Sequence, residues 1–415
     1  MPIGTLPWVR NPALPDAVRN LAATPSFYGL VMWIAGFLVY YYGPIPWNRP
    51  TGNFWVVYIS VAFCFLLSSL FSIGILNRTA HSPSGWWVIR NSRTTSFYSI
   101  IILHLVGFAG VAKYVVDFGR SMGDIRMFQH AFVYESYLIR MEAETTTSYG
   151  FQISYIGWIA VGFSLLYKSP QAWKKRVVLL ASLLQFSINI VFIDRTRPTW
   201  IIFTGLILLV ITSRSLTTKR LLGLVALIPL TLVCLFVLIG SWIGKTDFNE
   251  AFKSEDKVSV LEGPIYYVGC GFAYLNWASD HVDRSTEFAQ RTLYPFYRVW
   301  EVFDRSKKPP SQINEFVNVP LPTNVGTFIE PFIRDGGLLL AMAGALMHSF
   351  ISDIMAMVLR RQGSPMGLFL LANLCFVNFI GFFTPKINTF PVWFFVAIWA
   401  LLSFLSIFNP SRVRY

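Results

Sequence analysis

The ionisable side chains best placed to support chemistry gather in one short stretch, residues 323–337. Glu330, Arg334 and Asp335 follow a polar turn there, and a glycine pair then leads directly into the apolar run 338–359. Charged groups at the edge of a membrane-length apolar segment are held there at a cost in free energy, so they commonly have a function. We therefore interpret this stretch as the floor of an active site.

Asp335 allows two interpretations. Its carboxylate could act chemically, as a proton acceptor in the site. Because it precedes a glycine pair at the predicted start of a helix, it could equally cap backbone N–H groups and complement the helix dipole. Both interpretations remain open at the level of sequence.

Two further arginines lie in a very tight turn, Asp194-Arg195-Thr196-Arg197-Pro198, between two apolar runs. The turn belongs to the outer face, and the positive-inside bias would place arginines on the inner one, so topology does not explain Arg195 and Arg197. Guanidinium forks bind phosphate oxygens bidentately, which would suit a phosphate-bearing ligand if these side chains point into a central cavity. A turn closed by a salt bridge to Asp194 is the alternative.

About ten apolar segments must position these residues. Hydrophobic residues make up 54% of the chain and charged residues 13%, whereas soluble domains carry roughly 25% charged residues. Runs of about 17–25 apolar residues can cross a bilayer as helices. They lie near 26–43, 53–76, 95–116, 151–167, 177–193, 199–213, 221–243, 337–359, 366–384 and 389–408. The predicted fold is an all-α polytopic membrane protein with about ten transmembrane helices.

Lysines and arginines indicate the orientation of these helices. If both termini are cytoplasmic, the inner segments hold 16 lysines and arginines, against seven in the short outer loops, and contain only one acid, Asp16. The positive-inside bias then places the stretch 323–337 and the arginine turn outside the cytoplasm. The net charge of +13 is therefore a topology signal, and nucleic acid is not expected as a partner.

The expected organisation has a large extracytoplasmic segment between two groups of helices. It comprises a cytoplasmic lead-in at 1–25, helices one to seven in 26–243, the large segment 244–336, helices eight to ten in 337–408, and a cytoplasmic tail at 409–415. In the large segment, 261–278 is apolar but interrupted by glycines and a proline, which predicts an interfacial or re-entrant element. The amphipathic stretch 292–303 predicts a second element at the membrane surface.

Several kinds of site find no support. The chain lacks a P-loop, a dinucleotide glycine fingerprint, a zinc-ligand spacing and a nucleophile elbow. Glu142-Ala-Glu144 could imitate an acidic metal-binding pair, but so common a pattern is better explained as a solvated charged face. We expect neither a metal nor another cofactor.

Five residues of the stretch stand out by type and spacing: Asn324, Thr327, Pro331, Asp335 and Gly337. Further positions lie upstream, at Glu262-Gly263-Pro264, Ala273, Asn276 and Thr292-Leu293-Tyr294-Pro295. Together with the arginine turn, they resemble the oligosaccharide repeat unit polymerases, the Wzy-type O-antigen polymerases of bacterial surface polysaccharide synthesis. The likeness covers roughly residues 190–345, and Gly326 and Gly336 depart from positions that often carry aromatic residues.

The resemblance implies a metal-independent glycosyltransferase of the GT-C type on the outer face of the bacterial inner membrane. It would transfer the growing glycan from one undecaprenyl pyrophosphate to the terminal sugar of another lipid-linked repeat unit. The expected partners are undecaprenyl-pyrophosphate-linked glycans and membrane lipids, together with a flippase and a chain-length regulator.

Such chemistry would need cations for the departing diphosphate and a base for the attacking hydroxyl. Losing one stabilising donor typically costs about 2.7–4 kcal/mol of barrier, and a base must lie within hydrogen-bond reach. The candidate cations are Arg195 and Arg197, followed by Arg140, Arg298 and Arg334, with Asn324 and Tyr266 as further substrate contacts. Asp335, Glu330 and His281 qualify as bases by residue type.

Three other functions compete with this one. A polysaccharide ligase of similar fold would hand finished glycan to a different acceptor. A lipid-linked oligosaccharide flippase or a transporter would need alternating access, and the chain shows no repeat between its halves and no matching pair of interrupted helices. A structural scaffold would not require arginines in short outer turns.

Overall fold

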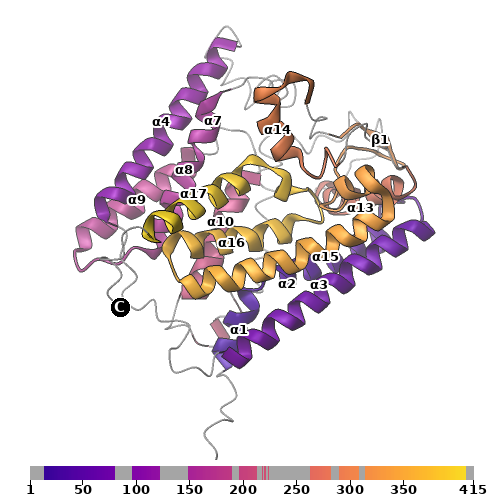
Figure 1. The fold of residues 1–415 in the computed structure, drawn as a ribbon, viewed down its shortest axis with the longest axis horizontal. Helices are drawn as coiled ribbons and strands as arrows, with labels where there is room; N and C mark the ends of the chain where they lie inside the picture. The colour runs from indigo at the N-terminus through magenta and orange to yellow at the C-terminus, as the bar shows by residue number, and fades with distance from the viewer. Residues whose placement is uncertain are drawn as a thin grey trace, which may run out of the picture.

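The protein is an assembly of helices around a buried centre (Figure 1). The computed structural model describes residues 14–79, 96–121, 148–188, 196–212, 217, 219–220, 223, 262–281, 289–307 and 314–407. Its helices are α1 (Leu14–Ala22), α2 (Pro25–Tyr42), α3 (Gly52–Thr79), α4 (Phe97–Ser121), α7 (Tyr149–Ile153), α8 (Tyr155–Leu166), α9 (Ala172–Ile188), α10 (Thr196–Thr212), α13 (Glu262–Asp280), α14 (Tyr294–Phe303), α15 (Glu330–Gln362), α16 (Pro365–Ile380) and α17 (Phe390–Ile407). Short 3-10 turns, η2 (Arg305–Lys307) and η3 (Lys386–Asn388), and one antiparallel pair, β1 (Val317–Asn318) with β2 (Pro322–Thr323), complete the described elements.

Four helical segments of this part of the chain are long and apolar enough to cross a membrane: Gly52–Ile75, Phe97–Arg120, Tyr149–Leu166 and Glu330–Gln362. The helices α10, α16 and α17 are apolar but shorter. The prediction of an all-α membrane protein is therefore confirmed at this level, whereas the number of ten spans stays a prediction. The predicted span 221–243 lies outside the described residues.

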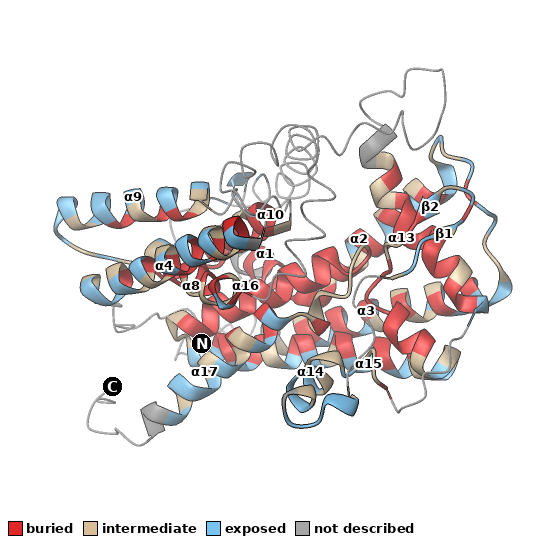
Figure 2. Cartoon of the chain, turned by 90° about the horizontal axis from the view of Figure 1, so that it is seen from above, coloured by how far each residue is buried: buried red, intermediate tan, exposed pale blue. Residues whose placement is uncertain are grey.

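The helix α16 forms the centre of the molecule. It packs against α2, α10, α15 and α8, and its residues from Met366 to Ile380 are all buried. A helix that is apolar on every side has to be covered on every side, which is the position α16 takes. On one flank α2, α3 and α15 lie together, on the other α4, α8 and α9 (Figure 1). Exposed residues follow the outer faces of α9 and α17 (Figure 2).

Two segments show local structure that the sequence did not indicate, whereas the interfacial or re-entrant placement of 261–278 stays a prediction. The lead-in contains the helix α1, which packs against α10 and α3 and buries Arg19 and Asn20. The apolar segment at 261–278 is one continuous helix, α13, in spite of its glycines. Gly269 and Gly271 permit close packing instead, because an added Cβ would lie 2.7 Å from the Trp47 indole nitrogen and 2.6 Å from the Phe382 carbonyl oxygen, respectively.

The helix α15 reverses direction at its glycine pair. Gly336 and Gly337 have non-helical backbone angles, and Gly337 has a φ of 69°, which favours glycine. Beyond this break the chain folds back, so that the Phe332 ring fills the space where a Cβ on Gly344 would lie. Twelve residues of straight helix would separate these positions by about 18 Å. The segment before the break therefore lies beside α15, inside the bundle.

The preceding loop reaches deeper still. The Phe328 ring lies 4.6 Å from the His348 ring, measured between centroids, and its backbone N–H donates to the Gly381 carbonyl at 2.7 Å. Ile329 and Thr327 are fully buried. Non-helical backbone at this depth is tolerated where protein surrounds it and supplies hydrogen-bond partners. We call residues 323–336 the re-entrant segment, because they fold back into the helix bundle.

Candidate functional site

The re-entrant segment holds a buried arginine near its C-terminal end. The Arg334 side chain is only 2% exposed. Its Nη1 donates to the Tyr274 hydroxyl at 3.2 Å, and its Nη2 donates to the Glu315 carboxylate at 3.0 Å. Its Nε lies 3.7 Å from Glu330 Oε1. A buried charge requires such partners, because its desolvation is otherwise too costly.

Glu330 is the second buried charge of the segment. It occupies the first turn of α15, in the short part that precedes the glycine pair, and lies one turn before Arg334. Its Oε1 forms no hydrogen bond with any described residue. Gly326 makes room for this carboxylate, since a Cβ at residue 326 would lie 3.0 Å from Glu330 Oε2 and 2.8 Å from Asn314 Nδ2. An aromatic side chain at position 326 would therefore displace both groups.

Asp335 caps a turn that is distant in sequence. Its carboxylate accepts the backbone N–H groups of Thr292 at 2.7 Å and Arg291 at 3.3 Å. From the other side, Asn388 Nδ2 donates to the Arg291 carbonyl at 3.0 Å. The backbone of Arg291 is thus fixed at both its N–H and its C=O. Asp335 therefore caps backbone groups, but they belong to the turn before α14 and not to the helix that follows the glycine pair, as the sequence had suggested.

Two residues without a predicted role complete the group. Burial, followed by the negative charge of Glu330, raises the pKa of the Tyr274 hydroxyl to about 12, so this group is protonated at neutral pH. The positive charge of Arg291 acts on both Tyr274 and Glu330. We call the six residues Tyr274, Arg291, Glu315, Glu330, Arg334 and Asp335 the ion cluster.

Arg197 lies elsewhere, in a closed aromatic cage. Its guanidinium carbon is 3.7 Å from the centre of the Phe151 ring and 4.6 Å from that of Tyr155. Its Nη1 and Nη2 donate to Ser154 Oγ at 3.2 Å and Tyr155 Oη at 3.0 Å. The side chain is 1% exposed. Thr196 and Arg197 form the first turn of α10 rather than a loop, and Arg195 lies outside the described residues, as does Arg140.

The remaining predicted site residues are spread over the surroundings. Arg298, which is exposed, pairs with the half-buried Glu301 on α14. His281 is exposed, stacks on Trp277 with a centroid distance of 4.7 Å, and has Nδ1 2.8 Å from the Trp277 carbonyl oxygen. Tyr266 donates its hydroxyl to the Pro322 carbonyl and thereby ties α13 to β2. Asn324 is half-buried just after β2.

The structure thus brings together Glu330, Arg334 and Asp335, but not Arg197, Arg298 or Tyr266. Sequence reasoning missed Tyr274, Arg291 and Glu315 as members of the ion cluster, and Asn314 as a neighbour of Glu330. The run that begins at Thr292 was a signal for Arg291, its immediate neighbour. Nothing in the sequence pointed to Tyr274, which lies 60 residues before Arg334. No group of three or more His, Cys, Asp or Glu side chains placed to hold a metal occurs within the described ranges.

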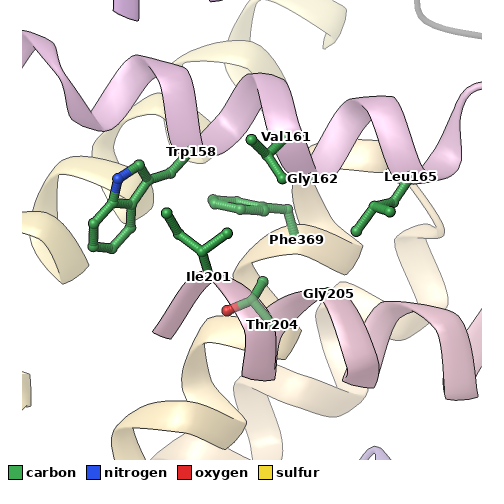
Figure 3. Close-up of a pocket in the computed structure, with 8 residues that line it drawn as sticks. All are labelled: Trp158, Val161, Gly162, Leu165, Ile201, Thr204, Gly205 and Phe369. Atoms are coloured by element: carbon green, nitrogen blue, oxygen red, sulfur yellow. The ribbon is translucent and has the colours of Figure 1, made fainter. Parts of the chain in front are cut away.

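An apolar pocket lies between α8, α10 and α16 (Figure 3). Trp158 and Phe369 form two of its walls, and Thr204 contributes a hydroxyl to an otherwise mainly apolar lining. Gly162 allows the Phe369 ring to approach α8, since a Cβ there would overlap the ring. Trp158 also borders the cage, with its ring centre 5.7 Å from the Arg197 guanidinium carbon. This lining suits hydrocarbon rather than sugar or phosphate.

Neither a family model, nor a curated protein, nor a solved structure matches the chain.

Proposed function

We propose that the chain is a lipid-linked-sugar-dependent glycosyltransferase that polymerises undecaprenyl-pyrophosphate-linked oligosaccharide repeat units on the outer face of the inner membrane. The observation that carries the proposal is the buried Arg334, held among carboxylates and a tyrosine on a re-entrant segment at the end of an apolar helix. The resemblance to Wzy-type polymerases supports it through residues of this same segment.

The ion cluster has the groups that such a transfer requires. The acceptor hydroxyl would attack the anomeric carbon of the donor sugar while the bond from that carbon to the diphosphate oxygen breaks. The hydroxyl proton would pass to a carboxylate, for which Glu330 is suited because its Oε1 forms no hydrogen bond with described residues. The diphosphate would leave with its negative charge stabilised by guanidinium groups.

Arg291 and Arg334 are better candidates than Arg197 for stabilising the departing diphosphate. Arg334 lies beside Glu330, and Arg291 is half-buried with its backbone fixed by Asp335 and Asn388. The Arg197 guanidinium is enclosed by three rings, so contact with a diphosphate would require the cage to open. Arg195 stays a prediction from sequence.

The test uses purified full-length protein in liposomes, with one undecaprenyl-pyrophosphate-linked repeat unit as the sole substrate. A polymerase produces a ladder of products that differ by one repeat unit, read by mass spectrometry. We expect Arg334→Lys to slow the ladder by about 10²-fold or more, because lysine keeps the charge but loses the fork. Arg361→Lys, at the far end of α15 and exposed, is the matched control and should leave the rate unchanged.

Thermal unfolding of each variant separates loss of chemistry from loss of fold. A folded wild-type protein that never extends the single repeat unit would refute polymerisation. If that protein instead transferred glycan only to an added second acceptor, it would be a ligase. If it moved the intact lipid-linked unit across the bilayer without new bonds, it would be a flippase.

A further inference from the structure

The helix α14 exposes a continuous apolar ridge. Phe296, Val299, Trp300 and Phe303 are 54%, 62%, 54% and 83% exposed, respectively. Their spacing of three, four and seven residues places all four on one side of a helix. Glu301 and its ion-pair partner Arg298 lie off this ridge. Figure 2 shows the exposed residues of α14 at the edge of the molecule.

The dimensions of α14 exclude a crossing of the membrane. The helix has ten residues, so it is about 15 Å long, half of the roughly 30 Å of a hydrocarbon core. Pro295 lies in its first turn, and Asp304 ends it by accepting the N–H and hydroxyl of Ser306. An apolar ridge on so short a helix needs a cover that lies alongside it.

The ridge continues onto the surface of an apolar helix. The Phe296 ring contacts Trp393 edge-on, with 5.2 Å between centroids. Trp393 belongs to α17, whose outer face also exposes Phe390, Leu401, Leu402 and Phe404. The ridge and this face therefore adjoin, and what covers one is expected to cover the other.

We propose that α14 lies in the plane of the membrane interface, with its ridge in contact with the phospholipid of the bilayer that surrounds α17. An aromatic and aliphatic ridge with a charged opposite side is the pattern of interfacial helices. Arg305 and Lys307, in the turn η2 directly after α14, lie where long cationic side chains reach the headgroup layer from an interfacial helix. This proposal does not depend on the chemistry of the ion cluster.

Spin labels test this placement directly. The full-length protein, with its natural cysteines replaced by alanine, carries a nitroxide at Val299→Cys or, as the control, at Glu301→Cys. Both are reconstituted in phosphatidylcholine vesicles, and collision rates with dissolved oxygen and with a water-soluble nickel chelate are measured. We expect the ratio of oxygen to nickel collisions to be several-fold higher at 299 than at 301, because oxygen partitions into lipid and the chelate does not.

Two results would overturn the proposal. Equal ratios at the two positions would place the ridge in water. A label at 299 that is shielded from both reagents would show that protein covers the ridge, either a second copy of the chain or another segment of it. Thermal unfolding of the labelled proteins confirms that each reading comes from folded material.

Discussion

Arg334 and its ion-pair partner Glu315 differ strongly in their exposure to solvent. Its own side chain is 2% exposed, whereas that of Glu315 is 60% exposed. An exposed carboxylate gains little from one ion pair, because water screens the interaction. The buried arginine, in contrast, must keep a partner at all times. An anionic ligand can therefore replace Glu315 at Arg334 with little loss.

Glu315→Gln tests this competition. The amide removes the negative charge that competes with the ligand, while Tyr274 and Glu330 still hold Arg334. We expect the KM for the lipid-linked donor to fall several-fold with kcat unchanged, measured by initial rates of polymerisation in liposomes. Glu301→Gln on α14 is the control for loss of a partly exposed carboxylate that pairs with an arginine, and equal KM values for both variants would contradict the competition.

A second buried carboxylate, Asp353, lies further along α15. Its Oδ1 accepts the backbone N–H of Ser26 at 3.0 Å, and its Oδ2 accepts the hydroxyls of Ser26 and of Ser68, the latter at 2.6 Å. Ser26 is in the first turn of α2, so Asp353 supplies from another helix the acceptor that a helix N-terminus needs. One side chain thereby joins α2, α3 and α15.

Asp353→Ala should lower stability substantially. Each buried donor left without a partner costs about 1–3 kcal/mol, and the Ser26 N–H loses its acceptor outright. The measurement is the midpoint of thermal unfolding in detergent. Ser349→Ala on the same helix is the control, because that hydroxyl bonds only to carbonyls of its own helix. A shift for Asp353→Ala no larger than the control shift would show that the three-helix junction contributes little.

At the scale of elements, the reversal in α15 decides where the charged residues lie. It turns the chain so that Glu330 and Arg334 enter the bundle rather than the surrounding solvent. The Gly337 φ of 69° is the conformation on which this geometry depends, since L-residues with a Cβ reach left-handed angles only at a cost. The Phe332 ring on Gly344 then holds the two parts together.

Gly337→Ala should therefore destabilise the protein by about 1–3 kcal/mol, because a φ of 69° with a ψ of −159° is a conformation that almost only glycine adopts. The same substitution at Gly74, in α3, is the control, because a Cβ there meets nothing within 4 Å and alanine favours helix by about 1 kcal/mol. Thermal unfolding should thus move in opposite directions for the two variants. A stabilising effect at Gly337 would mean that the reversal tolerates a side chain.

Sequence patterns predicted where helices lie better than how they turn. The apolar runs gave the positions of α2, α3, α15 and α16, because helices of that length need apolar faces in lipid. The glycines of α13 looked like interruptions, yet close packing against Trp47 and Phe382 requires small residues in the same way. The glycine pair at 336–337 marked a break, but its direction follows from the contact between Phe332 and Gly344, which local sequence does not encode.

At the scale of the whole molecule, the ion cluster and the loop after α2 lie on the same side. Asn276 of α13 donates to the Arg49 carbonyl at 3.0 Å and accepts the Thr51 N–H at 2.9 Å. Gln362 ends α15 at its other end, 25 residues after the reversal and thus about 38 Å away along the axis. Glu315 and Gln362 therefore mark opposite ends of a helix of membrane-spanning length.

Cysteines at these two positions should react from opposite faces of the membrane. The reagent is a membrane-impermeant maleimide, applied to cells with a permeabilised outer membrane and an intact inner membrane. Glu315→Cys should be labelled in these cells, and Gln362→Cys should react only after lysis. This pattern follows from the positive-inside bias of the loops. Reversed labelling would put the ion cluster in the cytoplasm and remove the basis of the proposed function.

The candidate site was predictable only in part, because most of its contacts join distant segments. The charges at 330–335 were apparent as charges beside an apolar run. Their partners Tyr274, Arg291 and Glu315 lie 19 to 60 residues away in sequence from the residues they contact, and only the packed structure brings them near. Arg197 shows the reverse case, since its position in sequence suggested an open turn while Phe151 and Tyr155 enclose it.

The cage of Arg197 also governs how tightly three helices are joined. Its hydrogen-bond acceptor Ser154 is the single residue between α7 and α8, and the arginine itself begins α10. The buried Arg197 guanidinium, stacked on aromatic rings, joins the start of α10 to the bend between α7 and α8. A ligand that drew the Arg197 guanidinium out of the cage would therefore also loosen the packing of α10 against α7 and α8.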